Sequence, residues 1–281
     1  MRKIVCPVDF SGAANNAVEY AANLSRHYGA QLTLLHIAED PQVGIKGNPN
    51  GRPSTPKEQM QLLIEKMERF KTMVEDDFSI DCLIKVSPFT PTVENALGNQ
   101  IEQGNYDLVV MGTAGTDELS HFFLGTHTSG LIRKTSTPLL IVPEGCAFQE
   151  LSEVVYASDY NTEDVIILKE LVDLVKDFDS KITVLHVSES DSEASKEIFS
   201  SFQDLYKDKL GDEGLLFDRI VHKNVPQGID EYVRGTDAKL LVLLTRRYSF
   251  FKKLFHESTT KSMSFVASYP VLISHGSVNP D

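Results

Sequence analysis

The stretch IVCPVDFS at residues 4–11 returns 150 residues later as VVYASDYN at residues 154–161, which aligns Asp9 with Asp159. At the same offset, TLLHI at residues 33–37 matches TVLHV at residues 183–187. Two further blocks, residues 106–113 with 238–245 and 137–141 with 269–273, match at an offset of 132. Four blocks in the same order indicate that the chain contains two copies of one structural unit.

Each copy alternates short apolar runs with longer amphipathic segments, as α/β proteins do. In the first copy we expect strands at 3–8, 31–37, 82–86, 107–111 and 138–142 and helices at 12–28, 57–77, 92–103 and 127–135. In the second copy we expect strands near 153–157, 181–187, 215–221, 239–244 and 270–273. Continuous runs of Val, Ile and Leu are typical of strands that are buried on both faces of a parallel sheet. The pattern predicts two tandem, doubly wound five-stranded parallel sheets.

The joint between the copies is expected within residues 143–149, which gives domains 1–146 and 147–281. The offset falls from 150 to 132, so the first domain carries about 18 more residues than the second. Most of them are assigned to Pro41–Pro56, a stretch rich in Gly, Pro and Asn that is typical of a long loop.

Composition narrows the classes of function. The formal charge of −13 argues against broad binding to nucleic acid or to anionic membrane surfaces. No apolar run is long enough for a membrane helix, and the first residues lack the pattern of a signal peptide. The three cysteines form no C-x-x-C pair, which argues against a disulfide framework or a zinc ribbon. We therefore expect a cytoplasmic protein.

A glycine pattern follows the fourth expected strand, in MGTAGTDELSHFFLGTHTSG at residues 111–130. It reads Gly112-x2-Gly115-x9-Gly125-Thr126 and precedes an expected helix. Glycines let a backbone approach phosphate closely, and the start of a helix offers unpaired N–H groups. Neither the Walker loop nor the dinucleotide fingerprint is present. From the spacing alone, a surface loop whose glycines only make turns fits equally well.

The strand end with Asp9 and Ser11, the LLHI segment and the glycine pattern together resemble the universal stress protein family, over essentially the whole chain. The resemblance implies a sheet order of 3-2-1-4-5 in each domain and an ATP site, with or without Mg²⁺, at the carboxyl edge of the first sheet. It places Asp9 beside the nucleoside, the backbone of Ile37 at adenine, and the glycine loop at the ribose and phosphates. The implied binding residues are Pro7, Val8, Asp9, Ser11, Ile37, Met111, Gly112, Gly115, Gly125, Thr126 and His127. His127 departs from the small or apolar residue that is usual in the family, so its role is open.

The second domain loses the pattern. Leu244, Arg247 and Glu257 stand where the first domain has Gly112, Gly115 and Gly125. Side chains at these positions fill the space that phosphate would need, and Glu257 adds a repelling charge. We expect this domain to be a degenerate copy that binds no nucleotide.

Other candidate sites have simpler explanations. His36 and His186 occupy equivalent positions, which the repeat explains without a metal, so hydrogen-bonded strand histidines are expected. Cys6 lies in the first strand and is expected to be a buried, unreactive thiol. No catalytic triad or pair of catalytic carboxylates stands out, and no residue is assigned a catalytic role.

The sequence therefore predicts an ATP-binding regulator of a stress response with an adenine nucleotide and an unidentified protein as its partners. A slow Mg²⁺-dependent ATPase and a scaffold that binds no nucleotide are the alternatives. Universal stress proteins commonly dimerise by pairing their fifth strands, and both copies keep a Pro-initiated apolar strand there, Leu139–Val142 and Val271–Ser274. The resemblance therefore implies that the two domains pack as an intramolecular pseudo-dimer. A homodimer is compatible with the same pattern.

Overall fold

The computed structural model describes residues 1–39, 55–113, 131, 134–160, 163–211, 214–245 and 268–275. These residues divide into two compact units, with the boundary between Phe148 and Gln149. The packing of the two units through their fifth strands stays a prediction.

Unit 1 alternates strands and helices as the sequence predicted. Its described elements are β1 (Lys3–Pro7), α1 (Gly12–Tyr28), β2 (Gln31–His36), α3 (Pro56–Phe78), β3 (Cys82–Val86), α4 (Val93–Gly104), β4 (Leu108–Thr113) and β5 (Leu139–Pro143). The expected bounds of the strands and of the first three helices agree with these to within two residues. The fourth expected helix, 127–135, lies largely outside the described residues.

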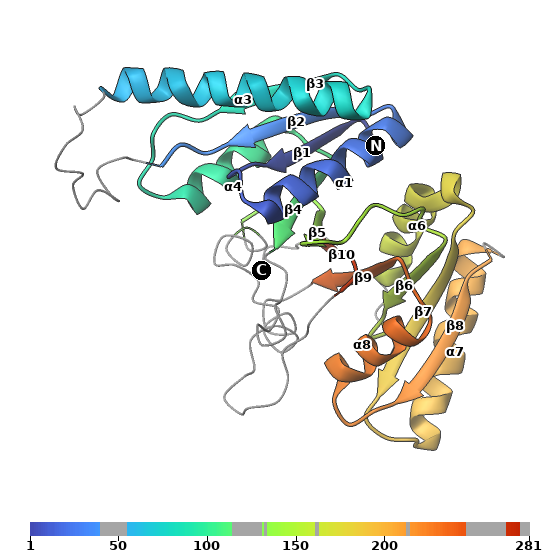
Figure 1. The fold of residues 1–281 in the computed structure, drawn as a ribbon. Helices are drawn as coiled ribbons and strands as arrows, with labels where there is room; N and C mark the ends of the chain where they lie inside the picture. The colour runs from blue at the N-terminus through green and yellow to red at the C-terminus, as the bar shows by residue number, and fades with distance from the viewer. Residues whose placement is uncertain are drawn as a thin grey trace. The chain divides into compact units, whose positions relative to one another are not determined.

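All strands of unit 1 are parallel and lie in the order β3-β2-β1-β4-β5. Figure 1 shows the long helix α3 lying along the β2–β3 side of the sheet, with α1 next to it. The chain moves from β1 to β2 in one direction and later returns to place β4 on the other side of β1. The order of the strands therefore reverses between β1 and β4, which is where open α/β sheets offer a binding crevice at their carboxyl edge.

Unit 2 repeats the same architecture. It contains β6 (Glu153–Ala157), α6 (Asp164–Val175), a 3₁₀ turn (Lys176–Phe178), β7 (Lys181–Ser188), α7 (Glu193–Leu210), β8 (Leu216–Val221), α8 (Val225–Gly235), β9 (Leu240–Thr245) and β10 (Val271–His275). Its strands are also parallel, in the order β8-β7-β6-β9-β10. Figure 1 shows α7 running beside β8 at the edge of this sheet.

Local signals explain where two helices of unit 1 begin. Ser11 has an extended backbone, and its hydroxyl accepts a hydrogen bond from the Ala14 N–H, so it caps α1. Thr55 and Glu58 form a reciprocal capping box at the start of α3. The expected loop Pro41–Pro56 was therefore one residue too long, because Pro56 is the first residue of α3, where a missing N–H costs nothing. Most of that loop lies outside the described residues.

Each sheet is buried between its helices. The middle residues of the central strands β1 and β4 are buried, as are those of β6 and β9 in unit 2. Tyr20 of α1 is buried with its ring edge-on to Phe148, with 5.1 Å between the ring centroids. Within the described parts of the chain, no helix combines the length and the apolar character needed to cross a membrane.

Candidate functional site

A tight turn follows β1 and presents the Asp9 carboxylate to solvent. Asp9 Oδ1 accepts hydrogen bonds from the Ser11 N–H, at 2.9 Å, and from the Ser11 hydroxyl, at 2.6 Å. Asp9 Oδ2 makes no hydrogen bond with any described residue. Because Ser11 also caps α1, the turn fixes one carboxylate oxygen and leaves the other as an exposed acceptor at the carboxyl edge.

Gly112 of β4 lies against the first turn of α1. A Cβ atom at this position would collide with the carbonyl oxygen of Ala13 and would come within 3.0 Å of the Ala14 nitrogen. The structure therefore leaves no room for a methyl group at this position. Glycine at this position lets β4 pack closely against α1, the helix that Ser11 caps. It therefore acts on the site through the packing of strand and helix.

The other predicted residues that the structure describes line the ends of the same strands. Val8 follows β1, and its N–H donates to the carbonyl of Leu35 in β2 at 2.8 Å. Val8, Ile37 and Met111 are all buried, each less than 10% exposed. Together with Pro7 they lie near the ends of β1, β2 and β4, at the switch in strand order.

Four predicted residues, Gly115, Gly125, Thr126 and His127, lie outside the described residues. The aromatic pairs Phe122–Phe123 and Phe250–Phe251, which the equivalent loops share, lie outside them as well. Participation of the four predicted residues in a site stays a prediction from the glycine pattern, and for the aromatic pairs the expectation is packing rather than contact with a ligand.

Phe10 is a part of this edge that the sequence reasoning missed. Its backbone is left-handed, with φ at 65°, and its ring packs on His36 and Phe70. The ammonium of Lys66 lies 3.5 Å from the centre of that ring. Tyr160, the equivalent residue of unit 2, has φ at 62° and stacks on His186 with 3.8 Å between the ring centres. An aromatic residue after the aspartate in both copies was the available signal.

Glu144 is a second residue that the sequence reasoning missed. It follows β5, and its N–H donates to the carbonyl of Thr113 at 3.0 Å. Its carboxylate lies where a side chain on Gly12 would project, beside the N-terminus of α1. A carboxylate is stabilised there by the helix dipole. The start of α1 is therefore already supplied with negative charge.

The histidines and cysteines behave as expected. His36 Nδ1 lies 2.6 Å from the carbonyl oxygen of Val8, and His186 Nδ1 lies 2.9 Å from that of Ser158, so both are hydrogen-bonded strand residues. Burial, and to a lesser degree the nearby Asp9, raises the pKa of Cys6 far above its ordinary value. No group of His, Cys, Asp and Glu side chains suited to a metal ion occurs among the described residues.

The equivalent edge of unit 2 is built differently. Asp164, where α1 has Ala14, is 1% exposed and begins α6. It accepts hydrogen bonds from the Tyr156 hydroxyl, at 3.0 Å, and from the Ser158 hydroxyl, at 2.5 Å. A buried carboxylate therefore occupies the first turn of the helix, where an anion would otherwise be attracted.

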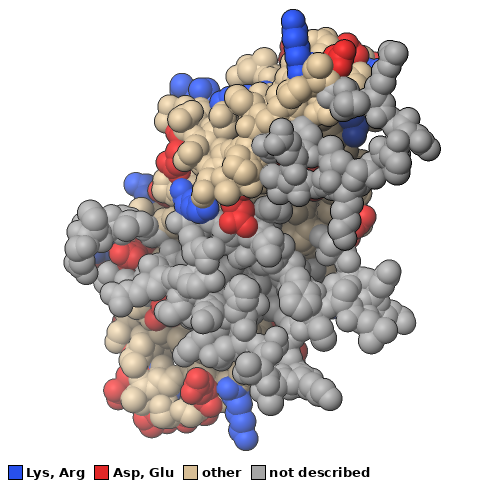
Figure 2. All heavy atoms as spheres, turned by 90° about the vertical axis from the view of Figure 1, so that its left-hand side faces the viewer, with Lys and Arg blue, Asp and Glu red and all other residues tan. Residues whose placement is uncertain are grey.

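Charged side chains are mixed on the described surface. Figure 2 shows the Lys and Arg side chains of one face in small groups, separated by acidic and uncharged residues. A continuous basic surface of the kind that binds nucleic acid is not seen on the described residues of this face.

Comparison with known proteins gives the chain its family. The model of the universal stress protein family matches residues 1–143 and again residues 151–275. Two universal stress proteins of Methanocaldococcus jannaschii are 27% and 28% identical to this chain. Each match covers 50% of this chain, and the two matches cover 94% and 81% of the respective relative.

Solved structures extend the likeness to the whole chain. A universal stress protein from Archaeoglobus fulgidus superposes with a TM-score of 0.71 at 16% identity, covering 97% of this chain and 98% of that one. A Pseudomonas aeruginosa protein described as a putative universal stress protein gives a TM-score of 0.59 at 13% identity, covering 98% and 94%. With two family matches in tandem and the same fold over its full length, the chain belongs to the universal stress protein family.

Proposed function

We propose that unit 1 binds one adenine nucleotide, ATP, at the carboxyl edge of its sheet, and that this binding regulates a partner protein. The observation that carries the proposal is the meeting of Asp9, the α1 cap and the start of the glycine pattern at one point of the edge. Asp9 and Ser11 are joined by two hydrogen bonds, Ser11 caps α1, and Gly112 packs against the first turn of that helix. The point lies at the switch in strand order, where such sheets bind ligands.

The residues present fit an adenine nucleotide. The free Oδ2 of Asp9 is an acceptor of the kind that a ribose hydroxyl would use, and the buried side chains of Val8, Ile37 and Met111 offer an apolar surface for a base. The glycine segment that follows Thr113 would supply backbone N–H groups to the phosphates. Mg²⁺ would neutralise phosphate charge when it is bound with the nucleotide.

Unit 2 is proposed to bind no nucleotide. Leu244 is a buried side chain at the position of Gly112, and Asp164 places a carboxylate at the start of α6. The carboxylate opposes an anionic ligand by charge repulsion, and a side chain at the position of Gly112 prevents the close approach of strand and helix that unit 1 has.

The proposal is tested by asking what the protein carries and what it takes up. Freshly purified chain is denatured, and the released small molecules are identified by mass spectrometry, which should yield an adenine nucleotide. ATP at about 100 times its Kd should then stabilise the native chain by about 2.7 kcal/mol. Repeating the titration with excess EDTA separates binding of Mg·ATP from binding of free ATP.

The two equivalent aspartates provide a matched pair of variants. Asp9→Ala should weaken ATP binding about tenfold or more, because an acceptor to the ribose is lost. Asp159→Ala, the same change in unit 2, should leave binding as it is. Unchanged stability with millimolar ATP would favour the scaffold alternative, whereas hydrolysis in a single turnover that is lost in Asp9→Ala would favour the ATPase.

A further inference from the structure

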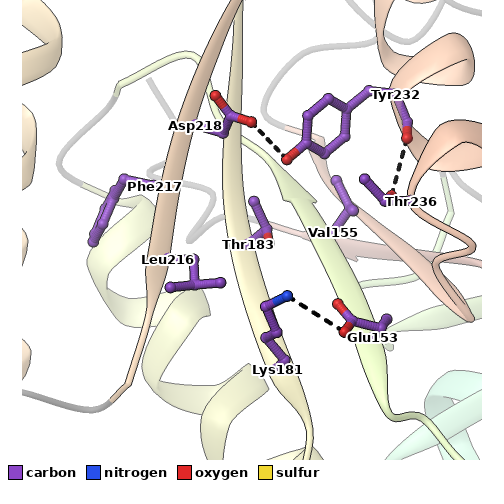
Figure 3. Close-up of a pocket in the computed structure, with 9 residues that line it drawn as sticks. All are labelled: Glu153, Val155, Lys181, Thr183, Leu216, Phe217, Asp218, Tyr232 and Thr236. Carbon is purple, nitrogen blue, oxygen red and sulfur yellow. Dashed lines mark hydrogen bonds and ion pairs between the residues drawn. The ribbon is translucent and has the colours of Figure 1, made fainter.

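A pocket of about 490 Å³ lies in unit 2, away from the carboxyl edge. The first residues of β6, β7 and β8 and the end of α8 line it, so it lies at the amino ends of these strands (Figure 3). Its volume is within the range of pockets that hold small molecules. The residues that line it play no part in the proposed nucleotide site.

Asp218 is the charged group of this pocket that lacks a counter-ion. Its Oδ2 accepts a hydrogen bond from the Tyr232 hydroxyl at 2.8 Å, and its Oδ1 accepts one from the Arg219 N–H at 2.7 Å. Both donors are neutral groups. No basic side chain among the described residues forms an ion pair with this half-buried carboxylate. Since a half-buried charge is costly without a partner, the site favours a cation.

The remaining charges leave the pocket with an excess of negative charge. Glu153 and Lys181 form an ion pair at 3.5 Å at the other end, so their charges offset one another. Burial and the neighbouring Asp218 raise the pKa of Tyr232, which keeps its hydroxyl protonated and donating at neutral pH. Figure 3 shows the Glu153–Lys181 pair and the Asp218–Tyr232 pair on separate sides of the pocket, with the exposed Leu216 supplying apolar surface.

Comparison of the two units shows that the fold does not require the Asp218–Tyr232 pair. Thr183 is in register with Leu216, and its equivalent Thr33 is in register with Leu83, so Asp218 corresponds to Lys85 of unit 1. At the offset of 132, Tyr232 corresponds to Gln100. Unit 1 forms the same sheet with a basic residue and an amide at these positions. The Asp218–Tyr232 hydrogen bond is thus specific to unit 2 and is not needed to form the fold.

We propose that unit 2 binds a small primary amine in this pocket, with the ammonium group on Asp218 and the apolar body of the ligand against Leu216. The ammonium donates to the Asp218 carboxylate, whose existing donors leave lone pairs available. A carboxylate ligand of the same shape would face the excess negative charge instead.

The test uses the full chain and two probes that share a ring and differ in charge, phenethylamine and phenylacetate. Binding of each is measured at pH 7 by saturation-transfer NMR and by calorimetric titration. We expect phenethylamine to bind at least about tenfold more tightly than phenylacetate, because only the amine can form an ion pair with Asp218. No detectable amine binding at millimolar concentration, or equal binding of the two probes, overturns the proposal.

Three variants locate the amine. Asp218→Asn should weaken phenethylamine binding about tenfold, whereas Asp237→Asn, which removes an exposed carboxylate just beyond α8, should change it by less than about twofold. Lys181→Gln removes the positive charge that offsets Glu153, so it should tighten amine binding severalfold. Damage to the fold would weaken binding instead, so this variant separates the two effects. Circular dichroism checks folding. Unchanged binding in a folded Asp218→Asn chain, or weaker binding in Lys181→Gln, contradicts the assignment.

Discussion

Gly112 of β4 and Ala13 of α1 are packed so closely that there is no room for a Cβ atom between the strand and the carbonyl oxygen of the helix. Ninety-nine residues separate them in the chain. The contact fixes the start of α1, and with it the Ser11 cap and the Asp9 turn, against the strand that leads into the glycine segment. Packing of backbone against backbone thus sets the position of the candidate site.

The first prediction concerns this contact. Gly112→Ala should lower the free energy of unfolding by about 1–3 kcal/mol, because the added methyl group must push α1 away from β4. Thermal or urea unfolding measures the loss. Gly235→Ala is the matched control, because a Cβ there meets nothing within 4 Å and alanine favours a helix. A Gly112→Ala chain as stable as the wild type would show that the strand and the helix are not so closely packed.

A second prediction compares two tyrosines of unit 2 whose hydroxyl groups are buried. The Tyr156 hydroxyl donates to the buried carboxylate of Asp164, whereas the buried Tyr160 hydroxyl has no partner among the described residues. Tyr156→Phe should therefore cost about 1.5–3 kcal/mol, the range for hydrogen bonds to charged groups.

Tyr160→Phe is the control for that experiment. It removes a hydroxyl that gains nothing from burial, so the chain should be as stable as the wild type or slightly more stable. Urea unfolding of both variants under the same conditions gives the comparison. Equal losses of stability in the two variants would contradict the hydrogen-bond assignment to Asp164.

A third prediction follows from the cysteines. Burial raises the pKa of all three thiols, that of Cys82 to about 11 and that of Cys6 still further. Only the thiolate reacts, and Cys146 is the most exposed of the three. At pH 8 a thiol reagent should label Cys146 first and Cys6 only on unfolding, and peptide mass spectrometry gives the order. Early labelling of Cys6 in native protein would show that β1 is accessible.

A fourth prediction is a pH effect at the start of β1. Asp107 accepts hydrogen bonds from the Arg2 and Lys3 N–H groups, at 2.6 and 3.0 Å. Partial burial opposes the charged form of Asp107, but these two bonds and the nearby positive charges outweigh it and hold its pKa below the ordinary value. The resulting stabilisation is present above the ordinary pKa and is lost as the pH falls through the lowered value.

Asp107→Asn tests this effect. The variant should lose stability at pH 7 and differ less from the wild type near pH 3, as followed by urea unfolding at each pH. Asp237→Asn is a suitable control, because that carboxylate is exposed and has no backbone partner in the described structure. A difference between Asp107→Asn and wild type that does not change with pH would contradict the account.

The sequence predicted the elements well because their signals are local. Each strand is a short apolar run, and Ser11 and Thr55 are ordinary helix caps just before amphipathic segments. The repeat made the second unit predictable from the first. Asp9 and Ser11 could also be identified from the sequence, because the turn that joins them spans only three residues.

Other features depend on contacts that no local pattern encodes. The close packing at Gly112 involves α1, which lies far earlier in the chain than β4. The spacing of the glycines could therefore not reveal this contact. Glu144 looks like an ordinary surface residue until β5 places it beside Gly12. The Asp218–Tyr232 pair joins a strand to the next helix, and its one sequence signal was the change from Lys85 and Gln100 in the first unit.

The central claim, one ATP site that resides in unit 1, is tested most directly by the stoichiometry of calorimetric titration with ATP. We predict one ATP per chain, and we predict that Gly125→Glu, which copies Glu257 of the second unit, abolishes binding. Circular dichroism must show that the variant is folded. A stoichiometry of two, or affinity like that of the wild type in folded Gly125→Glu, would contradict the claim.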